Sequence, residues 1–543
     1  MSIGASLNTK MSPPAEVVGL SPEARSHEAC VEIALVLAET PVRSKAEVCK
    51  IKRRVSRKYG LRGMPKDADV LAVARNLKLT NLEKLEELLK EKPVRTISGV
   101  APVAVMTSPH PCPHGRCVMC PGGPHSPFNS PQSYVGREPA ALRAAQNDYD
   151  PYRQVRHRLC QLHEIGHDVT KVELILMGGT LTARPEEYQR WFVGECLRAM
   201  ADFAREHGVE VRNVGTTFET RPDYAREREI DLMLELGATK VELGVQHVES
   251  DVLELIRRGH TVEDTIEANR RLKDSALKVG FHIMPGLPGS DFKRDLKMFH
   301  RIFEDERFKP DYLKIYPTLV LEGTELYEMW RRGDYEPLDD ERAVELIANV
   351  KKIIPKWVRI QRVQRDIPAQ LIVAGVKKSN LRQLALKKLK EMGISCRCIR
   401  CREAGHSYLR GKPPEDANIE LLCESYEACG GRELFISYED VENDVLVAFL
   451  RLRFPYRPHR PELEDAALIR ELHVYGEALP LSVRKRSSWQ HRGFGAALLK
   501  TAEELAAAEG FGKIVVMSGI GVREYYVRFG YRREGPFMAK LLG

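Results

Sequence analysis

The stretch KVELILMGGTLTARPEEYQRWFVGECLRAMADFAREHG, residues 171–208, decides the fold class of this chain. Its first seven residues form an apolar run of strand length, and residues 185–208 carry the apolar spacing of an amphipathic helix. The same unit recurs downstream, with further strands expected at residues 210–219, 239–246, 278–285 and 311–317. Strands that alternate with helices at this spacing form parallel βα units. We therefore expect an α/β fold built on an open or closed βα barrel over about residues 98–366.

A different pattern begins after residue 421. Two apolar segments, residues 433–440 and 444–454, are separated by only three residues, which indicates an antiparallel pair. A third strand is expected at residues 466–476, followed by a basic loop, an alanine-rich helix and shorter strand and helix segments. This order predicts a second domain of mixed α/β type.

The composition is that of a globular chain of 543 residues, 29% charged and 43% hydrophobic, with a net charge of +8. Its length excludes a small binding module. The longest apolar run, residues 30–38, contains Glu32 and falls far short of a transmembrane helix. Residues 1–26 show no secretory signal pattern. We expect a cytoplasmic protein with no membrane partner, whose 12 cysteines stay reduced and bind metal where they cluster.

The strongest local charge excess lies in RSKAEVCKIKRRVSRK, residues 43–58, with eight basic residues and one acid on a stretch without Gly or Pro. Cations on a helix of this length release counterions from a nucleic acid backbone, so the segment indicates phosphate binding. A solvated helix face remains the alternative. A second basic segment, RVQRD at residues 362–366, belongs to the barrel. The expected phosphate-binding residues are Lys50, Lys52, Arg53, Arg54, Arg57, Lys58, Arg362 and Arg365.

Three cysteines lie in the loop CPHGRCVMCPGG, residues 112–123, ahead of the strand that opens the quoted stretch. Each iron of a cubane iron–sulfur cluster wants a protein ligand, and this loop supplies three: Cys112, Cys117 and Cys120. One iron would then keep an open position, as chemically active centres do. The alternative is a structural zinc knuckle completed by His110 or His114.

This loop, followed by βα units, resembles the cluster motif of the radical S-adenosylmethionine superfamily, although its first gap has four residues where the commonest motif has three. The tripeptide GGT at residues 178–180 resembles the glycine motif of that superfamily, where glycine lets the backbone approach the ligand. The resemblance implies a radical SAM-type partial (βα) barrel that binds a 4Fe–4S cluster and S-adenosylmethionine. The expected S-adenosylmethionine contacts, all at strand ends, are Gly178, Gly179, Thr180, Glu219, Arg221 and Gln246.

The hexapeptide QHRGFG, residues 490–495, opens a long helix after a strand and a loop. That arrangement aims backbone N–H groups and the positive end of a helix dipole at an anion such as a pyrophosphate. Together with the strand at residues 471–474 and the paired tyrosines Tyr525 and Tyr526, the domain is similar to the GNAT acetyltransferases, in which acetyl-CoA lies between two splayed strands. Ordinary packing is expected for one of the two tyrosines.

A radical SAM barrel joined to a GNAT domain resembles the catalytic subunit of Elongator, a tRNA carboxymethyluridine synthase. CVMCPGGPHSPFNSPQSYVGREP, ETRPDY, RELHVYG and REYYVRFGY carry this resemblance, which runs from about residue 45 to the C-terminus. The chain resembles the single-chain archaeal and bacterial forms, which implies no obligatory partner subunits and allows a homodimer. The implied catalytic residues are Lys171, Glu471 and Tyr526. The implied acetyl-CoA contacts are Lys171, Glu471, Leu472, His473, Val474, Gln490, Gly493, Phe494, Gly495, Ala496 and Tyr526.

Between the two domains, CRCIRCREAGH at residues 396–406 has a spacing that suits tetrahedral zinc. The expected ligands are Cys396, Cys398, Cys401 and His406, with Cys423 or Cys429 as alternatives to His406. The chain is then expected to comprise a basic, tRNA-binding helical segment (1–97), the radical SAM barrel (98–390), a zinc-binding linker (391–420) and the GNAT domain (421–543).

The resemblance implies that a 5′-deoxyadenosyl radical takes a hydrogen from the acetyl methyl group of acetyl-CoA, and that the carbon radical adds to C5 of the wobble uridine. Radical chemistry suits this methyl group because its hydrogens are only weakly acidic. Hydrolysis of the thioester leaves a carboxymethyl group, and the reaction requires an electron donor. Two alternatives stay open: a protein lysine acetyltransferase with Glu471 as general base, and a non-catalytic tRNA-binding protein. Lys314 and Tyr316 are pocket residues without an assigned role.

Overall fold

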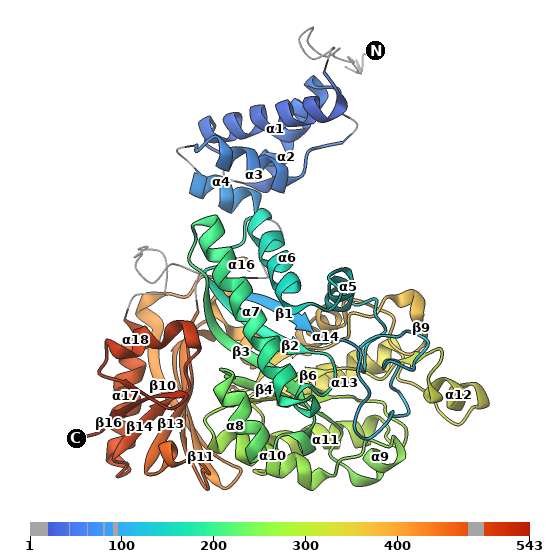
Figure 1. Cartoon of the computed structure of the whole chain (residues 1–543), viewed down its shortest axis with the longest axis vertical. Helices are drawn as coiled ribbons and strands as arrows, with labels where there is room; N and C mark the ends of the chain where they lie inside the picture. The colour runs from blue at the N-terminus through green and yellow to red at the C-terminus, as the bar shows by residue number, and fades with distance from the viewer. Residues whose placement is uncertain (1–19, 43, 62, 80–81, 91–95, 476–492) are drawn as a thin grey trace. The chain divides into compact units, whose positions relative to one another are not determined.

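The computed structural model describes residues 20–42, 44–61, 63–79, 82–90, 96–475 and 493–543 (Figure 1). The chain falls into two compact units. The first is drawn from residues 1–96 and 157–169, and the second from residues 97–156 and 170–543. Helix α6 (Pro151–Glu164) contributes to both. The expected barrel and GNAT domain therefore belong to one compact body.

The first unit is a small helical body. Apolar side chains from one face of each helix, including Ile33, Val48 and Leu71, form its core. Ser44 accepts a hydrogen bond from the backbone N–H of Glu47 at 3.3 Å and so caps the basic helix. The helix expected within residues 43–58 is confirmed. The helices are α1 (Pro22–Glu39), α2 (Lys45–Lys58), α3 (Asp67–Asn76) and α4 (Leu82–Leu89), together with the end of α6.

The second unit is built on seven parallel strands in the order β1-β2-β3-β4-β5-β6-β8. The two edge strands do not close on each other, so the predicted partial (βα) barrel is confirmed. These edge strands, β1 and β8, were not among the strands expected from the sequence. The strands are β1 (Ala101–Met106), β2 (Lys171–Met177), β3 (Arg212–Thr220), β4 (Lys240–Gln246), β5 (Lys278–Ile283), β6 (Tyr312–Ile315) and β8 (Arg359–Arg362).

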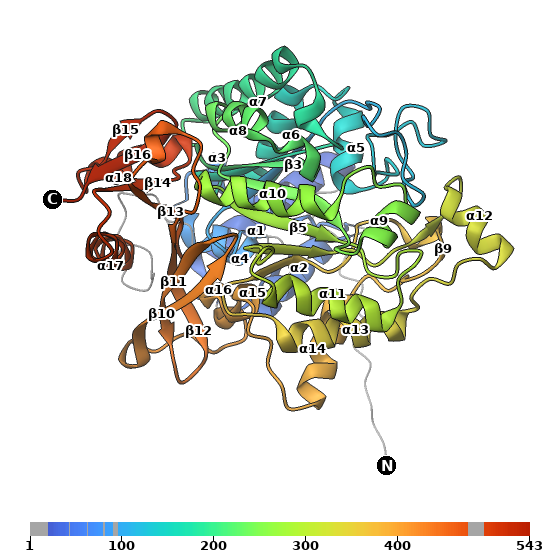
Figure 2. The ribbon, with the colours of Figure 1, turned by 90° about the horizontal axis from the view of Figure 1, so that it is seen from below.

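Helices cover the outer face of this sheet (Figure 2). They are α7 (Glu186–His207), α8 (Glu227–Glu235), α10 (Val262–Asp274), α11 (Phe292–Glu304) and α13 (Asp340–Ile353). Strand β7 (Val320–Leu321) pairs with β9 (Ile372–Ala374). The remaining helices are α5 (Pro139–Gln146), α9 (Ser250–Leu255), α12 (Glu325–Arg332), α14 (Leu381–Glu391), α15 (Ile399–Arg402) and α16 (Ala404–Leu409). Among the described residues, no helix is long and apolar enough to cross a bilayer.

A second seven-stranded sheet, in the order β10-β11-β12-β13-β14-β16-β15, forms the C-terminal part of the same unit. The predicted mixed α/β domain is confirmed. Strands β13 and β14 run parallel, and their pairing covers only Ala466–Ile469 of β13. The elements are β10 (Ile419–Ala428), β11 (Gly431–Asp440), β12 (Val445–Phe454), β13 (Ala466–Val474), α17 (Phe494–Ala508), β14 (Lys513–Val516), α18 (Arg523–Val527), β15 (Arg532–Glu534) and β16 (Phe537–Leu541).

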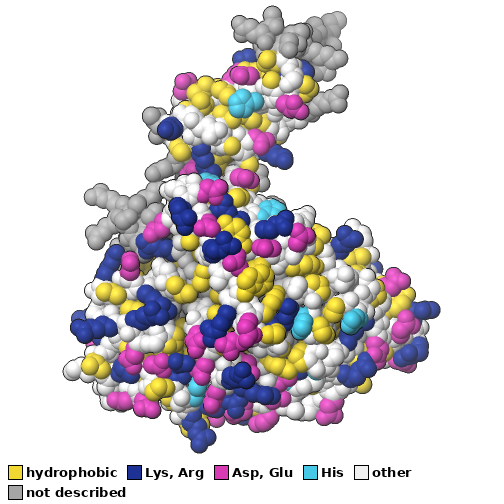
Figure 3. All heavy atoms as spheres, viewed as in Figure 1, with side chains coloured by type: hydrophobic (Ala, Val, Ile, Leu, Met, Phe, Trp, Pro, Cys, Tyr) yellow, Lys and Arg dark blue, Asp and Glu magenta, His cyan; other side chains and the backbone are white. Residues whose placement is uncertain are grey.

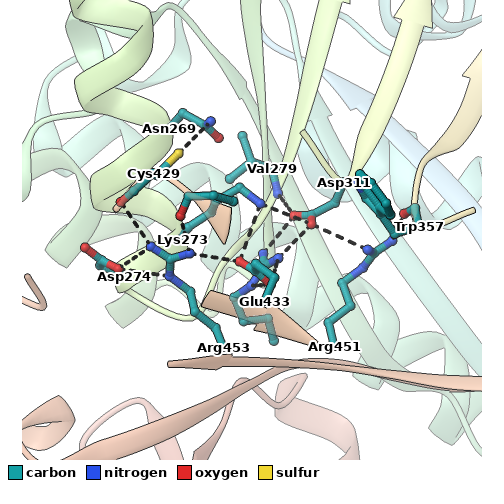
Figure 4. Close-up of polar contacts among 12 residues, drawn as sticks. Asn269, Lys273, Asp274, Val279, Asp311, Trp357, Cys429, Glu433, Arg451 and Arg453 are labelled. Carbon is teal, nitrogen blue, oxygen red and sulfur yellow. Dashed lines mark hydrogen bonds and ion pairs between the residues drawn. The ribbon is translucent and has the colours of Figure 1, made fainter. Parts of the chain in front are cut away.

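Buried ion pairs join this second sheet to the barrel (Figure 4). Arg470 of β13 donates to Asp311, which precedes β6, at 2.7 Å. Arg453 of β12 donates to Asp274, at the end of α10, at 2.6 Å. Glu433 of β11 accepts hydrogen bonds from both arginines. Because the barrel partners immediately precede strands β5 and β6, the GNAT sheet docks on the N-terminal ends of the parallel strands.

Candidate functional site

The cysteine loop follows β1 and therefore lies at the C-terminal ends of the barrel strands, opposite the GNAT sheet. Each of its three sulfurs has a polar neighbour. Donors placed around thiolates stabilise an anionic iron–sulfur cluster, so the residues fit such a group. The pairs are Cys112 Sγ with Thr180 Oγ1 at 3.6 Å, Cys117 Sγ with His114 Nε2 at 3.1 Å, and Cys120 Sγ with Gln132 Nε2 at 3.2 Å.

The spacing of these sulfurs bears on the zinc-knuckle alternative. In the described part of the chain, the three thiols whose sulfurs lie within 4.8 Å of one another are those of Cys396, Cys398 and Cys401, and the loop cysteines form no such close group. The described residues therefore hold no preassembled group of three loop thiols around a single ion, as a zinc knuckle would need.

The glycine motif after β2 packs directly against the cysteine loop region. Gly178 and Gly179 adopt φ values of +123° and +102°, which glycine tolerates best. A Cβ on Gly178 would clash with Thr107, and one on Gly179 would lie 3.0 Å from the Cβ of Gln132. Because Gln132 and Thr180 both contact cluster cysteines, the structure brings the predicted glycine motif and the predicted cluster ligands together.

Arg221, a predicted S-adenosylmethionine contact, is buried, and its guanidinium group binds protein partners. Its side chain is 2% exposed. Nε and Nη2 donate to Asp223 at 2.9 and 2.8 Å, and Nη1 donates to the carbonyl of Arg258 at 3.0 Å and contacts His114 Nδ1. Burial, together with Arg221 and Arg258, lowers the pKa of His114 to about 3. Arg221 therefore orients a neutral histidine beside Cys117. Gln246, the last residue of β4, has a φ of +69°.

Charged side chains gather inside the barrel on β3 to β6, where interiors of this type are normally apolar. Lys314 Nζ lies 2.9 Å from Glu219 Oε1 and also contacts Glu242, and His282 Nε2 lies 2.9 Å from Glu242 Oε2. Burial alone would lower the pKa of Lys314, but the two carboxylates outweigh it and hold this pKa well above its usual range. Glu219, a predicted S-adenosylmethionine contact, thus binds Lys314. The sequence did not predict Glu242 and His282 as members of this group, although each is a polar residue within an apolar strand.

At the GNAT end, Glu471 has both carboxylate oxygens occupied. Oε2 accepts from Arg451 Nε at 2.9 Å, and Oε1 accepts from the hydroxyl group of Tyr312. Burial alone would raise the pKa of Glu471, but Arg451 and Lys278 outweigh it and hold this pKa below its usual range. A carboxylate kept ionised in this way is a weak base, so Glu471 is poorly arranged to deprotonate a lysine substrate.

The side chains that follow Glu471 alternate in direction, as strand geometry requires. His473 Nε2 lies 3.1 Å from the backbone oxygen of Ser98, which precedes β1 of the barrel. Leu472 and Val474 pack against the GNAT core. The predicted acetyl-CoA segment of β13 therefore has one face on the barrel and the other on the GNAT core.

The two neighbouring tyrosines of α18, Tyr525 and Tyr526, lie differently with respect to the start of α17. Gly493 precedes the helix with a φ of +93°. A Cβ on Gly495 would lie 2.5 Å from the hydroxyl oxygen of Tyr525, so glycine lets this hydroxyl group reach the first turn. Tyr526 is 6% exposed in the hydrophobic core, and burial raises its pKa. The Tyr525 hydroxyl group thus lies at the first turn of α17 and Tyr526 packs in the core, and acetyl-CoA contact by Tyr526 stays a prediction.

The other predicted residues of this region are Phe494, Ala496 and Gln490. Phe494 packs on Tyr438, with ring centroids 4.8 Å apart, and Ala496 lies in the first turn of α17. Gln490 lies outside the described residues.

Lys171 is the first residue of β2 and pairs in register with Arg212 of β3. The GNAT backbone packs here, because a Cβ on Gly521 would lie 2.9 Å from the Cβ of Arg212. Lys171 therefore lies at the GNAT end of the barrel, together with Glu471. The seven residues of β2, at roughly 3.3 Å each, place this end about 20 Å from the glycine motif.

The three linker cysteines form a compact site of their own. Cys396, Cys398 and Cys401 hold their sulfurs within 4.8 Å of one another. The Nζ of the buried Lys351 lies 3.4 Å from Cys396 Sγ and 3.7 Å from Cys401 Sγ. His406 is not a member of the group, since its Nε2 lies 3.2 Å from Glu403.

The two alternatives to His406 do not join the linker cysteines either. Cys423 is exposed on β10. Cys429 is buried, and its sulfur lies 3.0 Å from the amide nitrogen of Asn269. Three thiols meet in the described structure, and the expected fourth ligand does not join them.

The basic helix α2 presents most of its cations to solvent. The exposed ones are Lys45, Lys50, Arg53, Arg54, Arg57 and Lys58. Lys52 is the exception, because it is 6% exposed and its Nζ lies 2.5 Å from Asp67 Oδ1. Lys52 therefore stabilises the first unit instead of binding phosphate, contrary to the prediction. Over the face drawn in Figure 3, acidic and basic side chains are interspersed.

The second basic segment lies at the C-terminal end of β8. Arg362 is exposed and pairs with Asp366 at 2.5 Å, whereas Arg365 is half-buried and lies with its guanidinium 5.6 Å from the ring centroid of Tyr134. This end of the barrel is also the end that carries the cysteine loop.

Family models match most of the chain. They are the ELP3 N-terminal domain (residues 26–97), the radical SAM superfamily (108–301), the radical SAM C-terminal domain (310–391) and the acetyltransferase (GNAT) family (400–531). The radical SAM match implies S-adenosylmethionine and a 4Fe–4S cluster, and the GNAT match implies acetyl-CoA.

Named relatives cover nearly the whole chain. A tRNA uridine(34) acetyltransferase of Methanocaldococcus jannaschii is 54% identical over 88% of this chain and 91% of its own length. Elongator complex protein 3 of Homo sapiens is 44% identical over 91% of this chain and 93% of its own length. The solved structure of Methanocaldococcus infernus Elp3 with an N-terminal deletion superposes with a TM-score of 0.72 at 50% identity, covering 82% of this chain and all of that one.

Proposed function

Because the chain belongs to the family of Elongator complex protein 3 and the archaeal tRNA uridine(34) acetyltransferases, we propose that it attaches a carboxymethyl group to C5 of the wobble uridine of tRNA. The observation that carries the proposal is the placement of two cofactor sites on the same set of strands. The cysteine loop and glycine motif occupy the C-terminal ends, and the acetyl-CoA elements occupy the N-terminal ends.

The residues that would hold the cofactors follow from this placement. Cys112, Cys117 and Cys120 would ligate the 4Fe–4S cluster, and the motif at residues 178–180 would contact S-adenosylmethionine. Bound together and supplied with one electron, these groups would provide a 5′-deoxyadenosyl radical, the chemistry that suits a methyl group whose hydrogens are only weakly acidic. Lys171, residues 471–474 and the start of α17 with Tyr525 would bind acetyl-CoA.

The chain's own side chains bind and orient the tRNA. The exposed cations of α2 and Arg362 would contact phosphates, while Lys52 serves the first unit as a structural residue. The target base must leave the anticodon stack to reach a barrel pocket, at a cost of a few kcal/mol that is lowest in a single-stranded loop. We assign the required electron to an external one-electron donor, and the chain acts alone or as a homodimer.

The rival activity, acetylation of a protein lysine, needs a general base beside an amine. Glu471 was the expected base, but Arg451 and Tyr312 occupy its carboxylate and its pKa is lowered. The side chain suits a positioning role, so the rival is not favoured.

We also propose that Cys396, Cys398 and Cys401 bind a structural zinc ion, since three close thiols suit tetrahedral coordination. His406 would require a rearrangement to become the fourth ligand.

The test is to incubate the reduced, cluster-loaded protein with tRNA, acetyl-CoA and S-adenosylmethionine and to analyse the nucleosides by mass. We expect carboxymethyluridine at position 34, and none with Cys117→Ala. Acetyl-lysine on a protein with no modified uridine would overturn the proposal.

A further inference from the structure

Inside the barrel, Lys314 has one N–H group that no acceptor of the described residues binds. An ammonium group carries three N–H donors. Two of them are directed at Glu219, 2.9 Å away, and at Glu242. Within the described residues, no third acceptor lies within hydrogen-bond distance of Lys314 Nζ. The high pKa of Lys314 means that the third N–H persists at neutral pH.

Tyr134 provides an acceptor on the other side of the same carboxylate. Its hydroxyl group donates to Glu219 Oε2 at 3.2 Å. Burial and the charge of Glu219 raise the pKa of Tyr134 well above its usual range, so the hydroxyl group keeps its hydrogen. Since that hydrogen points at Glu219, the lone pairs of the Tyr134 oxygen remain for a ligand. Glu219 is thus flanked by one spare donor and one spare acceptor.

Further side chains near this pair offer groups that suit a nucleobase and its phosphates. Gln132, two residues before Tyr134, contacts the sulfur of Cys120, so the pair lies beside the cluster loop. The half-buried ring of Tyr316 stands edge-on to His282, with centroids 5.7 Å apart, and offers an aromatic surface for stacking. Arg365 lies over the Tyr134 ring and adds a cation for the phosphates that flank an extruded base.

We propose that Lys314 and Tyr134 read the Watson–Crick edge of the wobble base and select uracil. Lys314 donates to uracil O4, and the Tyr134 oxygen accepts from N3–H. Cytosine carries an amino group at C4 and a bare N3, so it would place donor against donor and acceptor against acceptor. A buried site that meets the wrong pattern leaves polar groups unpaired, which is the source of strong discrimination. This inference rests on the proposed function and names the residues that choose its substrate.

The test measures binding, so it does not depend on turnover. Anticodon stem-loop RNAs that differ only at position 34, with uridine or cytidine, are titrated against the full-length protein at one salt concentration by fluorescence anisotropy. The variants are Tyr134→Phe, which removes only the acceptor oxygen, and Lys314→Gln, whose amide can serve either base. The matched control is Tyr152→Phe. It removes a hydroxyl group that donates to Asp202 at 3.0 Å, in another part of the fold.

We expect the wild type and Tyr152→Phe to bind the uridine stem-loop about tenfold more tightly than the cytidine stem-loop. Tyr134→Phe and Lys314→Gln should each reduce this gap to about threefold, because each variant keeps one of the two contacts that read the base. Wild-type protein that binds both stem-loops equally, or a Tyr134→Phe protein with the wild-type melting temperature that keeps the tenfold gap, would overturn the inference. If the wild type discriminates in this way but forms no carboxymethyluridine, the inference stands and the proposed function fails.

Discussion

Tyr312 of the barrel strand β6 donates its hydroxyl hydrogen to Glu471 of the GNAT strand β13, while the neighbouring Asp311 accepts from the neighbouring Arg470 at 2.7 Å. Two consecutive residues of one strand thus bind two consecutive residues of the other, which sets the position of β13 along the barrel axis. Two residues further on, β6 carries Lys314. The strand proposed to contact acetyl-CoA is therefore aligned directly with the strand that carries Lys314.

Removing Glu471 should destabilise the second unit strongly. Glu471→Ala removes the nearer carboxylate partner of the buried Arg451, whose other partner, Asp311, lies 3.6 Å away; breaking a buried pair typically costs about 3–5 kcal/mol. Urea unfolding followed by circular dichroism measures the change. Glu504→Ala removes the exposed pair with Lys500 and should change the stability by less than about 1 kcal/mol. Equal effects of the two changes would contradict the role of Glu471 as a buried anchor.

The interface between the barrel and the GNAT sheet should lose stability at acidic pH. Burial opposes ionisation of Asp311, Glu433 and Glu471, yet their arginine and lysine partners outweigh it and hold each pKa below its usual range. A carboxyl group with a lower pKa in the folded state contributes stability above its unfolded pKa, roughly 4, and loses it as the pH falls through the folded value. The free energy of unfolding should therefore stay nearly constant from pH 7 to about pH 5 and drop steeply below about pH 4. Asp311→Asn should flatten this dependence, and an unchanged slope would argue against the assignment.

The two glycines of the motif after β2 should not tolerate alanine. Gly178→Ala places a Cβ against Thr107 at a φ of +123° and should abolish binding of S-adenosylmethionine to the cluster-loaded protein, measured by calorimetry. Gly194 in the middle of α7 has nothing within 4 Å of an added Cβ. Gly194→Ala should keep binding and stabilise the helix by roughly 0.5–1 kcal/mol. Loss of binding in both variants would indicate a general folding defect.

The zinc content of single variants should show that the linker cysteines bind the metal and that Cys423 and His406 do not. We expect one equivalent of zinc by mass spectrometry, lost in Cys398→Ala because the other two thiols alone cannot hold the ion. Cys423→Ala and His406→Ala should retain it, since neither side chain lies in the close group. Iron in place of zinc, or zinc loss in His406→Ala, would require a different site.

Salt should report which cations of α2 meet the nucleic acid. A plot of log binding constant against log salt concentration has a slope of roughly −0.7 to −0.9 per phosphate contact. Arg53→Ala, Arg54→Ala and Arg57→Ala combined should reduce the slope for tRNA by about 2. Lys52→Ala should leave the slope nearly unchanged but lower the stability of the first unit, because Lys52 is buried on Asp67. A slope that responds to Lys52 as to the arginines would contradict the burial argument.

Local patterns were sufficient for the elements and the motifs. The strand at residues 171–177, the helix within 43–58 and the mixed C-terminal domain follow from hydrophobic periodicity, which depends on neighbours in the chain. Hydrophobic periodicity did not predict the edge strands β1 and β8, because β1 begins with Ala-Pro and β8 has only four residues, three of them polar. The excess of basic residues in α2 could not reveal that Lys52 faces Asp67, fifteen residues away.

The sequence by itself determined the βα barrel and the mixed C-terminal sheet, the cysteine loop, the glycine motif and the helix that opens after residue 493. Only the tertiary structure decided that the Tyr525 hydroxyl group faces Gly495, that Glu471 binds Arg451 and Tyr312, and that Glu242 and His282 join Lys314. The reason is physical: a motif expresses interactions among residues close in the chain, whereas the charge state and hydrogen-bond capacity of a side chain depend on partners that only folding brings together across distant strands.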